Sequence, residues 1–346
     1  MSAPKSTEFA ANPLQKHGQL ASAIEQSWYQ ATWWTWLLVP LSAIFAGLTA
    51  LRRWCYRIGL AKSSQLAAPV IIVGNISVGG TGKTPFTLWL CQYLQQQGLK
   101  PGILSRGYGA NIQAPCLVTL NMSASEVGDE PLLLAQQTGV PVVVCPQRVS
   151  GAQFLLANTE CNIVICDDGL QHYALARDLE IVLIDGQRGL GNGWLLPAGP
   201  LREGAWRLNT VDLVLSNSAA SPLTPHVLAI HSALPQALST SSEPLVAGTQ
   251  VALVSGIGNP ERFVLTAQQA GFSIGSKHFF PDHHPFSADD FRTIPTPLLM
   301  TAKDAVKCQP FAQPNWYYLP IAAQMPAAAE QVLWQKLQQI RSRYGL

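Results

Sequence analysis

A glycine-rich stretch at residues 70–85 constrains the fold of this chain more than any other part of its sequence. It reads VIIVGNISVGGTGKTP: an apolar run, a turn with several glycines, and then Gly-Lys-Thr at the expected start of a helix. In such a strand–loop–helix unit, the backbone N–H groups of the loop and the helix N-terminus surround the oxygen atoms of a nucleotide phosphate. The stretch therefore predicts an α/β protein whose parallel sheet carries a nucleotide-phosphate site.

The same loop predicts roles for individual side chains. Lys83 is placed to reach the β- and γ-phosphates and to assist phosphoryl transfer, and the Thr84 hydroxyl is a predicted ligand of Mg²⁺. A strict Walker A pattern has glycine where this chain has Ser77, but the order of strand, loop and helix is kept. The residues expected to bind the nucleotide are Ser77, Val78, Gly79, Gly80, Thr81, Gly82, Lys83 and Thr84.

The nucleotide is predicted to be ATP rather than GTP. Guanine-specific P-loop proteins usually carry Asn-Lys-x-Asp after a late strand. Here the corresponding run at 211–217, VDLVLSN, ends in Asn217 without the Lys-x-Asp. ATP and Mg²⁺ are therefore the expected cofactors.

Two adjacent aspartates follow a second apolar run. In Asn162–Asp168 (NIVICDD), Asp167 and Asp168 stand at the carboxyl end of a predicted strand, the edge at which open α/β sheets bind ligands. Either carboxylate can hold Mg²⁺ beside the phosphates, and the sequence does not distinguish between them. Asp185 ends another predicted strand and is a weaker alternative. An Asp at a strand end can also be merely a turn former.

Beyond Lys62, short apolar runs alternate with helical stretches, which is typical of an α/β fold whose sheet is covered on both faces. The predicted organisation is an N-terminal helical segment (1–62), a P-loop lobe (63–220) and a second α/β lobe (221–346) that contributes to the acceptor site. Part of 217–247, rich in Ser, Pro, Ala and Leu, is expected to connect the lobes. The predicted strands are 70–73, 140–145, 163–166, 181–184, 211–215, 251–255 and 298–301, and the predicted helices are 84–97, 261–270 and 331–343.

The N-terminal segment differs in composition from the rest of the chain. Residues 27–51 carry no charge, and residues 1–62 hold five of the ten Trp and a charge balance of +4, against −2 for the remainder. At about 1.5 Å per residue, the uncharged stretch is long enough to cross a hydrocarbon core of about 30 Å. Membrane attachment is therefore expected, and nucleic-acid binding, which requires a broad basic face, is not. The sequence leaves open whether the helix spans the membrane or lies on its surface.

Further features of this segment predict how it is oriented. Four Trp cluster at one end and three Arg at the other, and the positive-inside rule places the basic end in the cytoplasm. Thr35, Ser42 and Thr49 recur every seven residues and predict a polar face that packs on protein while the rest meets lipid. Pro40 is expected to kink the helix. Seven Cys without a Cys-x-x-Cys pair indicate a reducing compartment.

Phosphoryl transfer to an alcohol requires a group that accepts the hydroxyl proton. The candidates are Asp129, in Gly-Asp-Glu-Pro ahead of an apolar helix, and His283, in Asp-His-His within the second unit. A carboxylate beside an imidazole orients the ring and stabilises its cation. Spacing does not show that the two residues meet, because Asp129 is also suited to cap a helix and adjacent His residues in a loop are often only surface residues.

Taken together, the motifs resemble the tetraacyldisaccharide 4′-kinase (lipid A 4′-kinase) family. The resemblance covers about residues 30–310, and the motifs occur in the family's order. They are the loop at Asn75–Pro85, Ser105–Gly109 (SRGYG), Gly128–Pro131 (GDEP), Asp167–His172 (DDGLQH), Arg188–Gly193 (RGLGNG), Leu196–Glu203 (LPAGPLRE), Ser255–Arg262 (SGIGNPER) and Phe280–His284 (FPDHH).

The resemblance implies two α/β/α lobes with the active site between them, at the cytoplasmic face of the inner membrane of a Gram-negative bacterium. It implies that ATP and Mg²⁺ are used to phosphorylate the 4′-hydroxyl of a tetraacylated glucosamine disaccharide 1-phosphate, which forms lipid IVA in lipid A biosynthesis. Asp129 and His283 would activate the hydroxyl. Asp167 or Asp168 would complete the metal site, and Glu203 would approach the metal or the nucleotide.

Two positions depart from the family's pattern. Ala302 stands where the family often has Glu, and Pro285 follows His284. The alternative function is a P-loop ATPase switch or a metal-insertion chaperone. A membrane segment together with a candidate proton acceptor favours the kinase, because a switch needs neither. Acyl-chain preference and oligomeric state are not indicated by the sequence.

Overall fold

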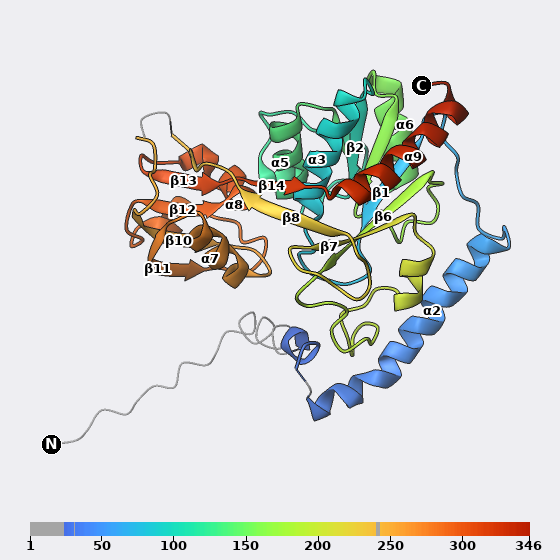
Figure 1. The fold of residues 1–346 in the computed structure, drawn as a ribbon, viewed down its shortest axis with the longest axis horizontal. Helices are drawn as coiled ribbons and strands as arrows, with labels where there is room; N and C mark the ends of the chain where they lie inside the picture. The colour runs from blue at the N-terminus through green and yellow to red at the C-terminus, as the bar shows by residue number, and fades with distance from the viewer. Residues whose placement is uncertain (1–23, 31, 240–242) are drawn as a thin grey trace.

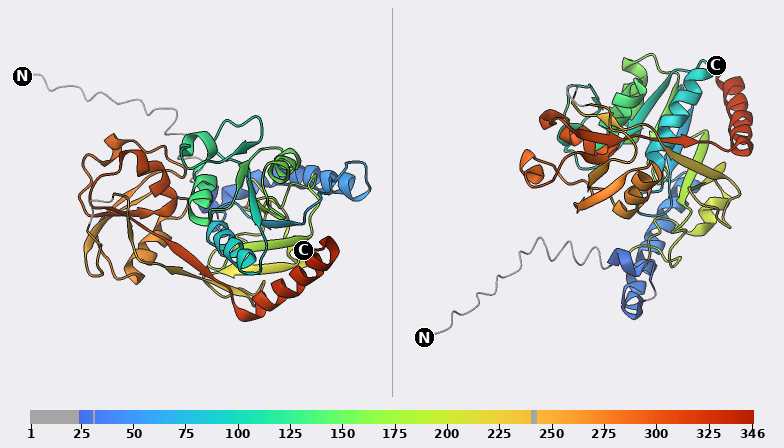
Figure 2. Two further views of the ribbon diagram at one scale, coloured as in Figure 1. Left: turned by 90° about the horizontal axis from the view of Figure 1, so that it is seen from above. Right: turned by 60° about the vertical axis from the view of Figure 1, so that its left-hand side comes forward.

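The computed structural model of this chain describes residues 24–30, 32–239 and 243–346. Two β-sheets lie next to each other, each with helices packed on it, and a long N-terminal helix lies at the edge of the larger lobe (Figures 1 and 2). The predicted fold class, two α/β lobes preceded by an apolar helix, is therefore confirmed. Residues 1–23 of the expected N-terminal segment lie outside the described residues.

Within the described residues, the larger sheet has nine strands in the order β14-β8-β7-β6-β1-β5-β2-β4-β3. The strands from β8 to β4 run parallel, and β14 and β3 are antiparallel edges. Strand β1 pairs with β5 on one side and β6 on the other, so the loop that follows it leaves the middle of the carboxyl edge. The bounds are β1 (Val70–Gly74), β2 (Pro101–Ser105), β3 (Cys116–Leu117), β4 (Val142–Val144), β5 (Ile163–Asp167), β6 (Leu179–Asp185), β7 (Leu213–Asn217), β8 (Val227–Ser232) and β14 (Ile321–Gln324).

Both faces of this sheet are buried. Ile71 and Val73 of β1 point into one apolar cluster with Phe86, while Val70 and Ile72 point into a second cluster on the other face. Because successive strand residues alternate between faces, burial on both sides explains why the strands read as continuous apolar runs. The helices of this lobe are α3 (Lys83–Gln96), α4 (Ala124–Val127), α5 (Asp129–Thr138), α6 (Arg148–Asn158), the 3₁₀ turn η2 (Ala205–Asn209) and α9 (Ala327–Tyr344).

The smaller sheet has five strands in the order β11-β10-β12-β13-β9, within the part of the chain that the structure describes. It also separates two apolar clusters, one around Trp316 and one around Phe263. Its elements are β9 (Gln236–Ala237), β10 (Gln250–Ser255), α7 (Pro260–Gln269), β11 (Ser273–Phe279), η3 (Ala288–Phe291), β12 (Leu298–Thr301), α8 (Ala302–Cys308), η4 (Gln309–Phe311) and β13 (Trp316–Leu319).

The two sheets divide the chain differently from the predicted boundary at residue 220. Strands β8 and β14 both follow that residue, yet both belong to the larger sheet. Helix α9 also returns to the larger lobe, where Leu333 and Leu337 join the cluster around Ile71. The chain therefore leaves the first lobe after β8, builds the second sheet and comes back, so that two connections join the lobes.

The N-terminal segment forms the 3₁₀ helix η1 (Trp33–Leu38) followed by α2 (Val39–Arg57). The predicted kink at Pro40 is wrong. Pro40 lies in the first turn of α2, where its missing N–H would have no partner in the helix and its fixed φ suits the helix start. The predicted polar face is confirmed at Thr35 and Ser42, which are both buried against the protein.

Candidate active site

The phosphate loop takes the predicted place between β1 and α3. Gly82 immediately precedes α3 with φ of +90°, a left-handed conformation that strongly favours glycine. A Cβ atom at Gly82 would also lie 2.3 Å from Nδ2 of Asn217, which donates a hydrogen bond to the Thr81 carbonyl at 3.0 Å. Both the backbone conformation and this close approach therefore require glycine here.

Two polar atoms beside the loop are buried and have no hydrogen-bond partner among the described residues. They are Oγ1 of Thr81 and Oδ1 of Asn75. Buried polar atoms are nearly always paired in folded proteins, because an unpaired one loses its water without compensation. Their position at the glycine-rich turn is consistent with a ligand that completes their hydrogen bonding.

Asp167 and Asp168 lie at the end of β5, but their environments differ. Asp168 accepts two hydrogen bonds from Nη1 of Arg202, at 2.9 and 3.1 Å, and lies 3.6 Å from Nζ of Lys83. Burial alone would raise the pKa of Asp168, but Lys83 and Arg202 hold this pKa down at about 2. Asp168 is therefore an anion that already has cationic partners.

The charge of Asp167 is less well compensated. Burial raises the pKa of Asp167 to about 7, the carboxylate of Glu130 adds to the shift, and Lys83 opposes it. Its Oδ1 atom is buried without a hydrogen-bond partner among the described residues. A desolvated carboxylate oxygen at the end of the strand next to the phosphate loop is suited to a cation, so the residues present fit Mg²⁺.

The described residues contain no group of three or more His, Cys, Asp or Glu that could hold a metal ion by themselves. Mg²⁺ in phosphoryl-transfer enzymes usually takes only one or two protein ligands and obtains the others from water and the phosphates. Thr84, in the first turn of α3, and Asp167, at the end of β5, are the candidate side chains for such a role.

Glu203, which the resemblance implies near the metal or the nucleotide, lies among charged and aromatic side chains of the larger lobe and of α2. It is buried, and its carboxylate accepts a hydrogen bond from the Tyr173 hydroxyl. Nε of Arg207 lies 3.4 Å away and Nη1 of Arg53, in α2, lies 3.9 Å away. One of these guanidinium groups connects Glu203 to the N-terminal helix. The Oε2 atom of Glu203, like Oδ1 of Asp167, is buried without a hydrogen-bond partner among the described residues, so the predicted role of Glu203 stays a prediction.

Asp129 and His283 come from different lobes and meet. Nδ1 of His283 lies 3.0 Å from Oδ2 and 3.2 Å from Oδ1 of Asp129. Asp129 is the first residue of α5 and is buried, while His283 is half-buried in the loop after β11 with φ of +60°. The alternative that Asp129 caps the helix is wrong, because Gly128 occupies the N-cap position and no side chain caps α5. Within the helix, Asp129 accepts from the N–H of its neighbour Glu130, at 2.9 Å.

The pair shifts the pKa values of both members. The hydrogen bond to Asp129 raises the pKa of His283, against the opposing effects of burial and of Lys303. Burial would raise the pKa of Asp129, but the hydrogen bond from His283 and the nearby Lys303 and Lys307 lower it overall. The carboxylate therefore stays ionised and orients the imidazole, leaving Nε2 of His283 as the nitrogen that can exchange a proton with a substrate.

Two lysines at this site were missed by the sequence reasoning. Nζ of Lys303 lies 3.3 Å from Nε2 of His283 and 3.3 Å from Glu130, and Nζ of Lys307 lies 3.8 Å from Asp129. Burial would lower the pKa of Lys303, but the surrounding carboxylates, Glu130 foremost, raise it. Both lysines belong to α8. The Lys-Asp pair within Thr301–Ala305 could have indicated Lys303 from the sequence.

A second contact joins the smaller lobe to the nucleotide side. Nη2 of Arg262, in α7, donates to Oδ1 of Asn217 at 2.5 Å and to Oγ of Ser218 at 2.6 Å. Asn217 in turn donates to the Thr81 carbonyl in the phosphate loop. Asp185, the weaker metal alternative, lies 3.9 Å from Arg262 and so has a cationic partner. The smaller lobe therefore reaches the phosphate loop through one intermediate side chain.

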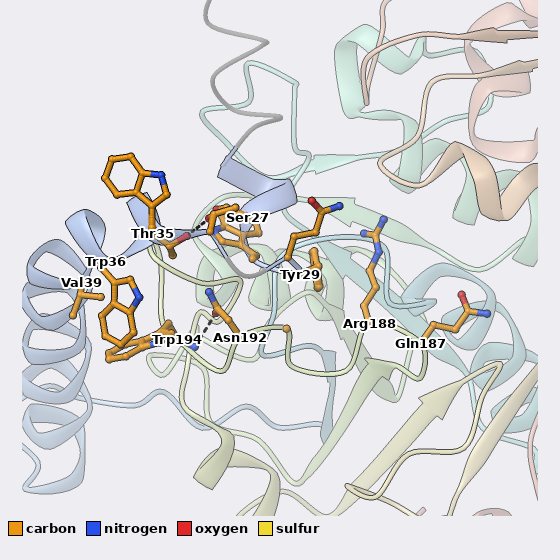
Figure 3. A pocket seen from close by; sticks show the side chains of 14 residues that line it. Ser27, Tyr29, Thr35, Trp36, Val39, Gln187, Arg188, Asn192 and Trp194 are labelled. Carbon is orange, nitrogen blue, oxygen red and sulfur yellow. Dashed lines mark hydrogen bonds between the residues drawn. The ribbon is translucent and has the colours of Figure 1, made fainter.

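A cavity of about 660 Å³ separates the start of the N-terminal helix from the loop that follows β6 (Figure 3). Trp36, Val39 and Trp194 line one end of it, and Tyr29 and Arg188 line the other. Arg188 lies over the Tyr29 ring, 5.2 Å from its centre. The same two residues also line a small cavity beside the glycines of the phosphate loop, so the N-terminal segment approaches the nucleotide site.

A phosphate loop and, close to it, a carboxylate–imidazole pair contributed by two lobes define a P-loop phosphotransferase by fold and site. The carboxylate of Glu130, next to Asp129, is near enough to influence the pKa of Asp167, so the two halves of the site are electrostatically connected. A sequence model of the tetraacyldisaccharide-1-P 4′-kinase family matches residues 34–338, and the chain belongs to this family.

Individual relatives agree with this assignment. The chain is 46% identical over 320 residues to a tetraacyldisaccharide 4′-kinase of Shewanella sp. (strain MR-7), covering 92% of this chain and 96% of that one. It is 44% identical over 326 residues to the protein of the same name from Tolumonas auensis, covering 93% and 100%. A crystal structure of LpxK from Aquifex aeolicus in complex with ATP matches with a TM-score of 0.76 at 28% identity, covering 88% of this chain and 99% of that chain. The resemblance seen in the motifs and the assignment to a kinase are thereby confirmed.

Proposed function

We propose that this chain transfers the γ-phosphate of ATP to the 4′-hydroxyl of a tetraacyldisaccharide 1-phosphate, the kinase step of lipid A biosynthesis that forms lipid IVA. The observation that carries the proposal is the hydrogen bond between Asp129 and His283. This bond supports a proton acceptor that both lobes contribute to, and a nucleotide-driven switch or a metal-insertion chaperone has no use for an alcohol-activating base.

The phosphate loop binds ATP in this proposal. The N–H groups of the loop and the N-terminus of α3 hold the phosphates, and Lys83 stabilises the negative charge that develops during transfer. Lys83 lies 3.6 Å from Asp168 in this structure, so that carboxylate holds the ammonium group at the carboxyl edge of the sheet. Thr84 and Asp167 would hold Mg²⁺, which would supply further neutralisation of the phosphate charge.

His283 serves as the base. Its Nε2 atom takes the proton from the 4′-hydroxyl as the oxygen attacks the γ-phosphorus, and the bond from the γ-phosphorus to the bridging oxygen breaks, so that ADP leaves. Asp129 stabilises the imidazolium through Nδ1. In this structure Nζ of Lys303 lies 3.3 Å from Nε2, the position that the hydroxyl must occupy. Lys303 therefore yields this position when the acceptor binds, and its carboxylate partners Glu130 and Asp282 retain it nearby.

The acceptor lipid is taken from the cytoplasmic face of the inner membrane, to which the N-terminal helix attaches the protein. The described residues contain one helical segment long and apolar enough to cross a membrane: Trp33–Arg57, of 25 residues, within which an 18-residue window has a mean hydropathy of 1.7. The basic residues at its carboxyl end favour the cytoplasmic side. The cavity between this segment and the loop after β6 lies on the path from the helix to the phosphate loop.

A direct assay tests the proposed reaction. The purified full-length chain is incubated with γ-labelled ATP, Mg²⁺ and the tetraacyl disaccharide 1-phosphate in detergent micelles, and label is expected in the lipid at the 4′ position. Lys83→Ala serves as the inactive control. ATP hydrolysis that releases only free phosphate, at the same rate with and without the lipid, would instead support a nucleotide-driven switch.

A further inference from the structure

Lys303 places its ammonium group on the nitrogen of His283 that must take the substrate proton. Nζ of Lys303 lies 3.3 Å from Nε2 of His283. It also lies 3.3 Å from Oε1 of Glu130 and 3.4 Å from Oδ1 of Asp282. An ammonium group has three N–H donors and no acceptor, so these three contacts use all of its hydrogen-bonding capacity. Nε2 is therefore the acceptor in its contact with Lys303.

This contact assigns the protonation state of the imidazole. A protonated ring would bring two cations to within 3.3 Å of each other, so His283 is neutral here. Because Nε2 accepts a hydrogen bond, the single ring proton is on Nδ1, which donates to Oδ2 of Asp129 at 3.0 Å. The ring thus has the tautomer that a base requires, but the lone pair of Nε2 is already occupied by Lys303.

Lys303 is not suited to be the base itself. Besides Glu130 and Asp282, the carboxylate of Asp129 lies 3.9 Å from its Nζ atom. Burial would lower the pKa of Lys303, but these three carboxylates raise it overall. The side chain therefore keeps its protons near neutral pH and acts as a donor.

The start of α8 fixes Lys303 in this position. Helices α5 and α8 pack against each other where the two lobes meet (Figure 1). Thr301 caps α8 by accepting from the N–H of Asp304 at 3.1 Å, and the Asp304 carboxylate accepts from the Gly256 N–H at 3.0 Å. Asp304 is fully buried, and Nζ of Lys307 lies 2.8 Å from its carboxylate. Lys303 therefore projects from a helix start that is attached to the core of the smaller lobe.

The stability of α8 does not explain a lysine at this position. Lys303 stands in the first turn, where the partial positive charge of the helix N-terminus disfavours a cation. The side chain is also half-buried, so its charge loses part of its hydration. Carboxylates from both lobes offset these costs, and they direct the ammonium group toward His283.

We propose that Lys303 restricts phosphoryl transfer to the lipid alcohol, by covering Nε2 of His283 until the acceptor displaces it. The inference rests on the proposed function, in which Nε2 takes the proton of the 4′-hydroxyl. A water molecule on an uncovered Nε2 would give one proton to the ring while its oxygen forms a bond to the γ-phosphorus. The bond from the γ-phosphorus to the bridging oxygen would break, and ADP and inorganic phosphate would be released.

The cover discriminates between water and the acceptor because they are held differently. Displacing Lys303 from Nε2 breaks one of its three hydrogen bonds, and those to Glu130 and Asp282 remain. A sugar hydroxyl is positioned by the rest of a large substrate, whose binding energy compensates for this loss. A single water molecule has no such additional contacts, so it does not compete with the ammonium group for Nε2.

The first experiment measures ATP hydrolysis without the acceptor. Release of ADP by the full-length protein is followed in detergent micelles that contain ATP and Mg²⁺ but no lipid substrate. Lys303→Ala is expected to raise this rate by about tenfold or more, which is part of the 10²–10⁴ that a general base typically contributes. Lys303→Arg keeps a cation that cannot accept a proton, so its rate should stay close to that of the wild type. Lys277→Ala, which removes an exposed lysine paired with Glu261 in the same lobe, is the control and should change nothing.

A double variant tests whether the added hydrolysis depends on the base. Lys303→Ala combined with His283→Ala should return ADP release to about the wild-type rate. A gain that persists in the double variant would overturn the proposal. A wild-type rate in Lys303→Ala, with melting temperature and ATP affinity unchanged, would overturn it as well. If Lys303→Ala does not fold, Lys303→Ser takes its place, because it opens the same space and keeps a polar group.

The titration of His283 provides a measurement that a merely structural role would not change. The groups that face its imidazole are Asp129 from α5, Asp282 from its own loop, Lys303 from α8 and the Tyr108 ring, whose centre lies 4.9 Å away. The hydrogen bond to Asp129 raises the pKa of His283, and Lys303 opposes this shift. In Lys303→Ala the imidazole should therefore titrate at higher pH, as measured by NMR. An unchanged or lower value would contradict the contact on which the proposal rests.

Phosphorylation of the lipid by the wild type is measured in parallel, so that the two proposals are tested separately. If the wild type transfers no label to the lipid, the proposed function is wrong. If the wild type labels the lipid but Lys303→Ala shows no added hydrolysis, the kinase reaction stands and only the cover on His283 is wrong.

Discussion

The nucleotide half and the acceptor half of the site are built in different ways. The nucleotide half lies within one strand–loop–helix unit, from Val70 to Gln96, with Asp167 and Asp168 added from the adjacent strand. The acceptor half depends on Asp129 and His283, which are 154 residues apart and belong to different lobes. The first half should therefore tolerate changes in how the lobes meet, whereas the second should not.

The largest effect is expected from the nucleotide half. Lys83→Ala removes the ammonium group that faces the phosphates and leaves Asp168 with Arg202 as its remaining close cation, so kcat/KM should fall by about 10³-fold or more and ATP affinity should fall as well. Steady-state kinetics and calorimetric ATP binding measure the two effects. Lys100→Ala, which removes an exposed lysine paired with Glu160, is the control and should leave both unchanged.

Changes in the acceptor half should lower turnover without lowering ATP affinity. Asp129→Asn and His283→Ala should each lower kcat by about 10²–10⁴ while ATP affinity stays close to that of the wild type, because the two side chains pair with each other on the acceptor side of the site. Since the two act as one unit, the double variant should be little worse than His283→Ala. If the two fold-reductions in kcat multiply in the double variant, the residues act independently, which would contradict the proposed pairing of Asp129 with His283.

The pH dependence of kcat tests whether His283 is the base. As a base, His283 must be unprotonated, and its hydrogen bond to Asp129 raises its pKa, so kcat should fall as the pH is lowered through that raised value. Asp129→Asn should move this limb to lower pH, and NMR titration of the imidazole should show the same displacement. The pH dependence of folding stability is opposite to that of kcat. Because the pKa of His283 is raised in the folded state, its pairing with Asp129 stabilises the fold at low pH, and this stabilisation is lost as the pH rises through the folded-state pKa.

The smallest effect is expected at the contact that connects the smaller lobe to the phosphate loop. Arg262→Ala removes the hydrogen bonds to Asn217 and Ser218 and should raise the KM for ATP by roughly 3–10-fold, with little change in the melting temperature. Arg262→Lys should restore part of the affinity. An unchanged KM would mean that the smaller lobe influences the site only through His283.

Much of the fold follows from local patterns. The apolar runs predicted β1, β5, β6, β7, β10 and β12 to within a few residues, because strands covered on both faces must be apolar throughout. Strand β2 begins with Pro101 and Gly102, and edge strand β11 alternates between half-buried and exposed residues, so neither has a continuous apolar run to reveal it. The return of β14 and α9 to the first sheet also has no local signal, since it depends on which sheet edge is left to be covered.

By itself, the sequence determined that this protein binds a nucleotide phosphate, that Asp167 and Asp168 lie at the edge of the same sheet, and that one apolar helix precedes the lobes. These features depend on contiguous residues whose backbone geometry and hydrophobicity specify their structure. Only the tertiary structure decided that Asp129 meets His283, that Glu203 is held by Arg53 and Arg207, and that α2 lies along the large lobe at both ends. Contacts between distant segments depend on how whole elements pack, and no local pattern encodes the distance between two lobes.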